Sequence, residues 1–208
     1  SAEFLRASAE RLSNSYPSLR IEPIVADLTD DFRIPAELPR PLVVAFLGST
    51  LGNFARAHAV ALLHRCSEAM RTEDRLLLGV DLKKRSARLN AAYNDAAGVT
   101  AAFNRNVLRV LNRELGADFE PDAFEHHAFY DPGHGRVEMH LVATLPMAVH
   151  IPDVGDFELD AGDSILTEIS RKYDRAEVDA TLGATSLVVE HWFEPEPGEY
   201  AVVVGRPV

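Results

Sequence analysis

The chain has 208 residues, 47% hydrophobic and 25% charged, a composition typical of a globular protein built from one large domain or from a domain with a substantial insert. The formal net charge of −11 argues against a nucleic-acid partner, because nucleic-acid binding depends on clustered Lys and Arg. No apolar run approaches the ~20 residues that span a bilayer, and the single cysteine, Cys66, cannot form an internal disulfide. We therefore expect a reduced, cytoplasmic protein with no membrane partner.

The first elements in chain order are a helix and two strands. Ser1 can N-cap a helix that ends before Tyr16-Pro17. Residues Ile21–Ala26 predict a strand, at a sheet edge or at a strand start because of Pro23. The continuous apolar run Pro41–Leu47 predicts a strand buried on both faces of a parallel sheet.

A second helix and a third strand complete a parallel α/β unit. The segment from about Ala55 to Arg71 predicts a helix, and strand Arg75–Val80 follows it and leads into Asp81. The helix places six residues on one apolar stripe: Ala55, Ala59, Leu62, Leu63, Cys66 and Met70.

From Lys83 to about His127 the pattern indicates helix. Its apolar residues align before Gly116: Val99, Phe103, Val107, Val110, Leu111 and Leu115. The remaining predicted elements are an alternating strand Arg136–Leu145, extended chain through Tyr173, a helix Arg175–Leu182, a strand Ser186–Phe193, a turn Glu194–Gly198 and a strand Tyr200–Gly205.

Glu168 and Ser170 lie in an extended segment, so they project from one face, roughly 6–7 Å apart along the strand. A carboxylate only accepts hydrogen bonds, whereas a hydroxyl can donate or accept. This pair suits a ring with one N–H and one bare nitrogen, such as imidazole. A site that bonds both ring nitrogens would reject amino acids that lack them by ~10⁴ or more. The alternative is an exposed strand that carries Glu and Ser without a function.

Three segments carry a family resemblance: Phe46–Asn53, Ala91–Thr100 with Phe103–Val107, and Ile165–Tyr173. Through them the chain resembles the histidine-specific methyltransferases of ergothioneine biosynthesis, which trimethylate the α-amine of free histidine, and the resemblance extends over its whole length. It implies L-histidine as substrate, hercynine as product, S-adenosylmethionine as cosubstrate and no metal.

The resemblance also implies the fold, a Rossmann-like class I methyltransferase sheet with an inserted α+β substrate-binding domain. We expect core residues at 1–83, the insert at 84–172, and the last helix with the C-terminal hairpin at 173–208. The family's first two strands and its Gly-rich turn have no counterpart here. We therefore expect this chain to be the C-terminal two-thirds of a longer protein, with a missing N-terminal segment, that is a monomer when complete.

On the cofactor side, the resemblance implies that Asp27 accepts a hydrogen bond from the adenine amino group. Leu28 stands where the family often has an aromatic residue. A carboxylate after a strand also fits ligand binding at the carboxyl end of an α/β sheet. The alternative for Asp27 is a cap of the turn or helix at 29–31.

For the substrate's amino-acid end, the resemblance implies that Asn53 contacts the carboxylate or amine, and that Gly48 and Thr50 line the path of the reacting amine. The alternative for Asn53 is an N-cap of the following helix. Tyr93 would bind the substrate carboxylate, although such a tyrosine is also common at the rim of a core. Met139 would form a wall near the imidazole, or else simply pack within its strand.

Several histidines cluster in the sequence, at Glu125-His-His127, His134 and His140, but their spacing matches no standard zinc motif. Two other functions stay open. One is a related N-methyltransferase that acts on another aromatic amino acid. The other is a noncatalytic fragment that holds only part of the cofactor site.

Overall fold

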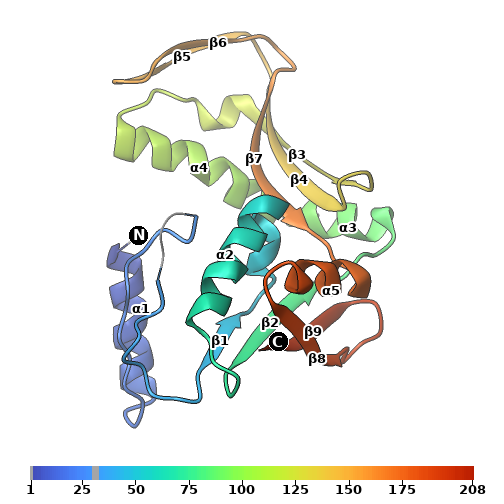
Figure 1. Ribbon diagram of the computed structural model, residues 1–208. Coiled ribbons are helices and arrows are strands. Elements are labelled where there is room, and N and C mark those ends of the chain that lie inside the picture. Colours follow the sequence, from blue (N-terminus) through green and yellow to red (C-terminus); the bar gives the residue numbers. More distant parts are fainter. Residues whose placement is uncertain (1, 30–32) are drawn as a thin grey trace. The chain divides into compact units, whose positions relative to one another are not determined.

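A computed structural model describes residues 2–29 and 33–208 (Figure 1). The chain divides into two compact units, the first ending at Glu37 and the second spanning Leu38–Val208. Within the described residues, no helix is both long enough and apolar enough to cross a membrane.

The first unit contains helix α1 (Ala2–Ser15), which confirms the predicted helix; its proposed cap, Ser1, lies outside the described residues. The predicted strand Ile21–Ala26 is wrong, because these residues form no regular secondary structure. Pro23 has no N–H to donate, and the unit's described residues supply no second strand. Strand-forming side chains alone therefore do not produce a ladder here.

A four-stranded mixed sheet forms the base of the second unit, in the order β1-β2-β9-β8. Strand β1 (Val43–Phe46) runs parallel to β2 (Arg75–Asp81), which confirms the α/β unit. Strand β9 (Tyr200–Pro207) inserts antiparallel between β2 and β8 (Leu187–Phe193), as the predicted C-terminal hairpin requires.

Burial follows most of the predicted stripe in the second helix, but not the prediction for β1. Helix α2 (Arg56–Ala69) buries Ala59, Leu62, Leu63 and Cys66. Strand β1 was expected to be buried on both faces, yet Val43 is 60% exposed. Among residues 38–208, β1 pairs only with β2 and lies at the sheet edge, which explains its exposure.

Two helices follow, α3 (Ser86–Tyr93) and α4 (Val99–Leu115). The prediction of helix to about His127 is wrong beyond Leu115, because Gly116 adopts a left-handed conformation (φ 68°) that ends α4. The expected apolar stripe of α4 is also largely exposed. Val99 and Phe103 are 68% and 64% exposed, and the buried residues are Asn104 and Leu108.

A second sheet has the order β3-β4-β7 and consists of β3 (Phe124–Asp131), β4 (Arg136–Ala143) and β7 (Ser164–Arg171). Strands β5 (Met147–Ile151) and β6 (Gly155–Leu159) form a separate two-stranded ribbon. Figure 1 shows β7 leading from this second sheet toward α5 (Arg175–Gly183), which packs on β8. Strand β7 therefore connects the two sheets.

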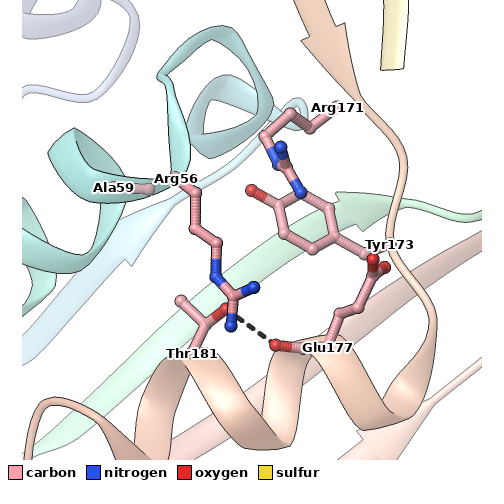
Figure 2. A pocket seen from close by; sticks show the side chains of 6 residues that line it. All are labelled: Arg56, Ala59, Arg171, Tyr173, Glu177 and Thr181. Carbon is pink, nitrogen blue, oxygen red and sulfur yellow. Dashed lines mark hydrogen bonds between the residues drawn. The ribbon is translucent and has the colours of Figure 1, made fainter. Parts of the chain in front are cut away.

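Tyr173, in the link between β7 and α5, fixes this link to the four-stranded sheet. It is only 3% exposed, its N–H donates to the Asp81 carbonyl at 2.9 Å, and its hydroxyl reaches the Leu51 carbonyl at 3.4 Å. Burial raises the pKa of its phenol to about 12. Figure 2 shows Tyr173 beside Arg171 and Arg56, around a cavity of about 20 Å³ that is too small for a substrate.

Candidate active site

The loop after β1 begins with two consecutive left-handed residues, Gly48 (φ 68°) and Ser49 (φ 59°). Glycine adopts this conformation freely, but serine needs support from its surroundings. The Ser49 N–H donates to the Gly79 carbonyl at 3.1 Å, and its hydroxyl accepts from the Asp81 N–H at 3.1 Å. The loop is thus fixed to the carboxyl end of β2.

The short 3₁₀ helix η1 (Thr50–Asn53) then approaches β7 very closely. A Cβ atom on Gly52 would lie only 2.8 Å from the Arg171 carbonyl oxygen, so only glycine fits without movement of the backbone. This approach brings the Gly48–Asn53 loop beside the end of β7.

These elements enclose an open cleft of about 400 Å³. Its lining residues are Gly48, Ser49, Asn53, Asp81, Tyr93, Glu168, Ser170, Lys172 and Tyr200. Five of them are among the seven substrate-binding residues predicted from the sequence, although they come from three separate segments: the 48–53 loop, α3 and β7. The size suits a small ligand.

The other two predicted substrate residues do not line the cleft. The Thr50 hydroxyl donates to the Leu47 carbonyl at 2.7 Å. Met139 is 3% exposed and packs in a core cluster with Leu89, Ala128 and Val137. Asn53 belongs to η1 and does not cap α2, whose N-cap residue is Ala55.

Asp27 and Leu28 belong to the first unit. The Asp27 Oδ1 atom accepts hydrogen bonds from the Thr29 N–H at 2.8 Å and the Thr29 hydroxyl at 2.7 Å. Chiefly the hydroxyl bond, and then the backbone bond, lowers the pKa of Asp27. The alternative cap at 29–31 falls partly outside the described residues.

Glu168 presents a half-buried carboxylate to the cleft. Burial raises its pKa, and the nearby Lys172 ammonium opposes this shift. Among the described residues the carboxylate makes no hydrogen bond or ion pair, so its oxygens are available to accept from a ligand.

Ser170 is 7% exposed and its hydroxyl belongs to a triangle of hydrogen bonds. The Tyr93 hydroxyl donates to it at 3.0 Å, and the Lys172 ammonium donates to it at 2.9 Å and to the Tyr93 oxygen at 2.7 Å. The single phenolic proton of Tyr93 is therefore used on Ser170. A contact from Tyr93 to a substrate carboxylate stays a prediction and would need that proton to turn away.

The sequence reasoning missed four residues that line the cleft, Ser49, Asp81, Lys172 and Tyr200, of which Lys172 and Asp81 form an ion pair. Lys172 is 1% exposed, and its ammonium lies 2.8 Å from the Asp81 carboxylate, which also pairs with Lys84. Burial acts to raise the pKa of Asp81, but the two lysines outweigh it and the pKa is lowered. Side chains alternate along a strand, so residues 168, 170 and 172 project from the same face. This alternation is the signal in the sequence that could have identified Lys172.

The clustered histidines are already engaged elsewhere. His126 Nδ1 lies 2.9 Å from the Asn104 amide, and His140 Nε2 lies 3.1 Å from Glu138. Ligand atoms of Asp131, His134 and Glu138 lie within 4.8 Å of one another, but these side chains already bond each other or Arg136, and nothing further at this group points to an ion.

Comparison with known proteins identifies the relatives of the chain. It is 41% identical over 203 residues to the histidine N-alpha-methyltransferase of Mycolicibacterium smegmatis, covering 97% of this chain and 63% of that protein. It is 29% identical over 167 residues to the L-tryptophan methyltransferase of Psilocybe serbica, covering 78% of this chain and 46% of the relative. The chain thus spans less than two-thirds of the length of these relatives.

Solved structures support the same fold. The CcbJ methyltransferase of Streptomyces caelestis matches with a TM-score of 0.53 at 13% identity, over 98% of this chain and 75% of that one. The mixed sheet and its methyltransferase neighbours confirm the class I fold, at an identity too low to indicate a substrate.

The profile of the S-adenosylmethionine-dependent, histidine-specific methyltransferases matches residues 1–207. The chain belongs to that family.

Proposed function

We propose that this chain forms the larger part of an enzyme that transfers three methyl groups from S-adenosylmethionine to the α-amine of L-histidine, giving hercynine for ergothioneine biosynthesis. The observation that carries the proposal is the cleft in which the unpaired Glu168 carboxylate lies beside the Ser170 hydroxyl. These groups suit the N–H and the bare nitrogen of a neutral imidazole.

The ring is bound between Glu168 and Ser170, and the amino-acid end extends toward Gly48 and Asn53 on the opposite wall. The Asn53 carboxamide can donate to the substrate carboxylate or accept from its amine. We propose the insert at 84–172 as the substrate-binding part of the enzyme, because it supplies Tyr93, Glu168, Ser170 and Lys172 to the cleft.

Asp27 would hold the adenine amino group of the cosubstrate. Its two hydrogen bonds within the described residues both go to Oδ1, so Oδ2 can accept from that group. The sulfonium of the cosubstrate supplies the electrophilic methyl group. The protein's contribution is to hold the amine in line with that methyl, since positioning is the main source of rate in such a displacement.

The attacking amine must be neutral, although the amine of free histidine is mostly protonated at pH 7, because an α-amino group titrates near ~7.7–8 in peptides and higher in free amino acids. The neighbouring sulfonium disfavours the protonated amine and lowers this pKa. The open side of the cleft at Gly48 offers water as the route by which the proton leaves.

The test uses the protein extended to the length of its relatives, hereafter the full-length enzyme. Incubated with L-histidine and S-adenosylmethionine, it should yield a product that carries three added methyl groups by mass spectrometry. The competing function, methylation of another aromatic amino acid, gains weight from the L-tryptophan methyltransferase relative. Equal turnover of tryptophan and histidine would contradict the proposal, and histidine binding without turnover would favour a noncatalytic role.

A further inference from the structure

We propose that Lys172 is a specificity-determining positioning residue. Its ammonium and the Tyr93 hydroxyl together occupy both acceptor lone pairs of Ser170, so Ser170 meets a ligand ring only as a hydrogen-bond donor, and the cleft selects neutral imidazole over imidazolium. This inference rests on the proposed function, because it assumes that the ring of histidine binds between Glu168 and Ser170.

All three protons of the Lys172 ammonium have acceptors within the protein. They are the Asp81 carboxylate at 2.8 Å, the Tyr93 oxygen at 2.7 Å and the Ser170 oxygen at 2.9 Å. With its side chain 1% exposed, the ammonium is also shielded from water. Lys172 therefore has no proton left for a ligand, and it acts through its neighbours.

The hydrogen bond from Lys172 has its main effect on the Ser170 oxygen, because this oxygen faces the ligand. A hydroxyl has one proton and two acceptor lone pairs. Lys172 takes one lone pair and Tyr93 donates to the other, at 3.0 Å. Only the hydroxyl proton of Ser170 remains, and it can bond a bare ring nitrogen but cannot accept from a ring N–H.

Imidazolium has an N–H on each nitrogen and would place one of them against the Ser170 proton. The other titratable or charged groups that line the cleft are Asp81, Glu168 and Tyr200. Glu168 attracts either form of the ring through its N–H, whereas Asp81 is already paired with Lys172 and Lys84. The donor-only Ser170 and the Lys172 charge together disfavour the cationic ring.

The experiment measures L-histidine binding to the full-length enzyme by calorimetry at several pH values. Because the imidazole pKa is about 6.5, the affinity should fall about tenfold for each pH unit below it. A histidine analogue with a 1,2,4-triazole ring, which protonates only in strong acid, should show a nearly flat profile. This comparison separates titration of the ring from titration of Glu168, which would affect both ligands.

Lys172→Met should weaken binding at pH 7.5 and flatten the histidine profile, to less than about a threefold change between pH 7.5 and pH 5.5. Its matched control is Lys83→Met, because Lys83 pairs with Asp174 and Glu177 outside the cleft. The control should retain the wild-type profile. If Lys172→Met does not fold, the double variant Lys172→Met with Asp81→Asn removes both partners of the buried pair and should give the same flattening.

The outcomes distinguish the inference from the function on which it rests. No histidine binding by the wild type at pH 7.5 would overturn the proposed function itself. Tight binding with a flat wild-type profile, or a variant that loses affinity equally at every pH, would instead leave the proposed function standing and make Lys172 a purely structural residue.

Discussion

Asn104 on α4 accepts a hydrogen bond from the Thr167 hydroxyl on β7, with 2.5 Å between the two oxygens. The Asn104 amide also donates to the His140 carbonyl on β4 at 3.0 Å. Thr167 is the extra residue of a β-bulge, because Met139 pairs with Glu168 whereas His140 pairs with Leu166. A one-residue change of register moves every later side chain to the other face, so this bulge determines that Glu168 faces the cleft.

Thr167→Val keeps the shape of the side chain but removes its hydroxyl. We expect a loss of about 1–3 kcal/mol in the free energy of unfolding, because Asn104 loses its donor in a buried site. Histidine binding should also weaken, as the bulge loses its tie to α4. Thr181→Val is the matched control, since the Thr181 hydroxyl is also buried and bonds the Glu177 carbonyl within α5. Both variants should be destabilised in denaturant titrations, and calorimetry should show weaker histidine binding only for Thr167→Val; equal affinities would rule out the role of the bulge.

Glu168→Ala should weaken histidine binding by about 1.5–3 kcal/mol, the range for a hydrogen bond to a charged group. Affinity for S-adenosylmethionine should change little, because the variant removes only a contact to the ring. Glu158→Ala, at an exposed position on β6, serves as the control and should bind both ligands like the wild type. If Glu168→Ala binds histidine unchanged, the carboxylate does not contact the ring.

Much of the four-stranded sheet and of α2 could be predicted from the sequence. The apolar residues of α2 and β2 recur with the period of a helix and of a buried strand, and these residues are buried in the structure. The predictions of secondary structure were wrong where the structure of a segment depends on other parts of the chain or on residues that end a helix. Ile21–Ala26 has strand-forming side chains but no second strand within its unit. The helix predicted to His127 was continued past Gly116 and Pro121, two residues that commonly end a helix before an alternating strand such as β3.

For the site, the sequence indicated Glu168 and Ser170 because strand alternation is local. The same alternation puts Lys172 on that face but does not show that it is buried, because lysine is almost never fully buried without a partner, and that partner, Asp81, lies 91 residues earlier. Asp81 itself is the last residue of β2, which runs parallel to β1, and the carboxyl end of such a strand is the position where α/β sheets bind ligands. That signal was present in the sequence and went unused.

Asp74 should make stability sensitive to acid. Its side chain is fully buried, accepts from the Leu42 and Arg71 N–H groups at 2.7 Å each, and pairs with Arg40. Burial acts to raise its pKa, but these partners together lower it. The stabilisation should therefore be present above the unfolded pKa of about 3.9 and be lost as pH falls below it toward the folded pKa.

Asp74→Asn should lose about 3 kcal/mol of unfolding free energy at pH 7, because Arg40 is left without its charge partner. Its stability should also depend less on pH below about 4 than that of the wild type. Urea titrations across this range test both expectations, with the exposed Asp160→Asn as a control that should match the wild type. Parallel pH profiles for wild type and Asp74→Asn would contradict the assignment.

Cys66 should resist thiol reagents in the folded protein. It is fully buried on α2, and burial raises its pKa to about 11, so the reactive thiolate is scarce at pH 8. We expect labelling to be at least ~100-fold slower in the native protein than in urea, and to follow opening of the structure. Fast labelling without denaturant would show that α2 is not stably packed.

The edge position of β1 leads to a prediction about hydrogen exchange. In residues 38–208 this strand pairs only with β2, so the amides of 43–46 that face away from β2 lack a ladder partner. We expect these amides to exchange quickly in this chain, whereas the amides of β2, paired on both sides, should be protected. In the full-length enzyme, the further residues should pair with β1, slow its exchange and strengthen binding of S-adenosylmethionine at the same time. Strong protection of all β1 amides in this chain alone, together with tight cosubstrate binding, would show that the sheet needs no further strand.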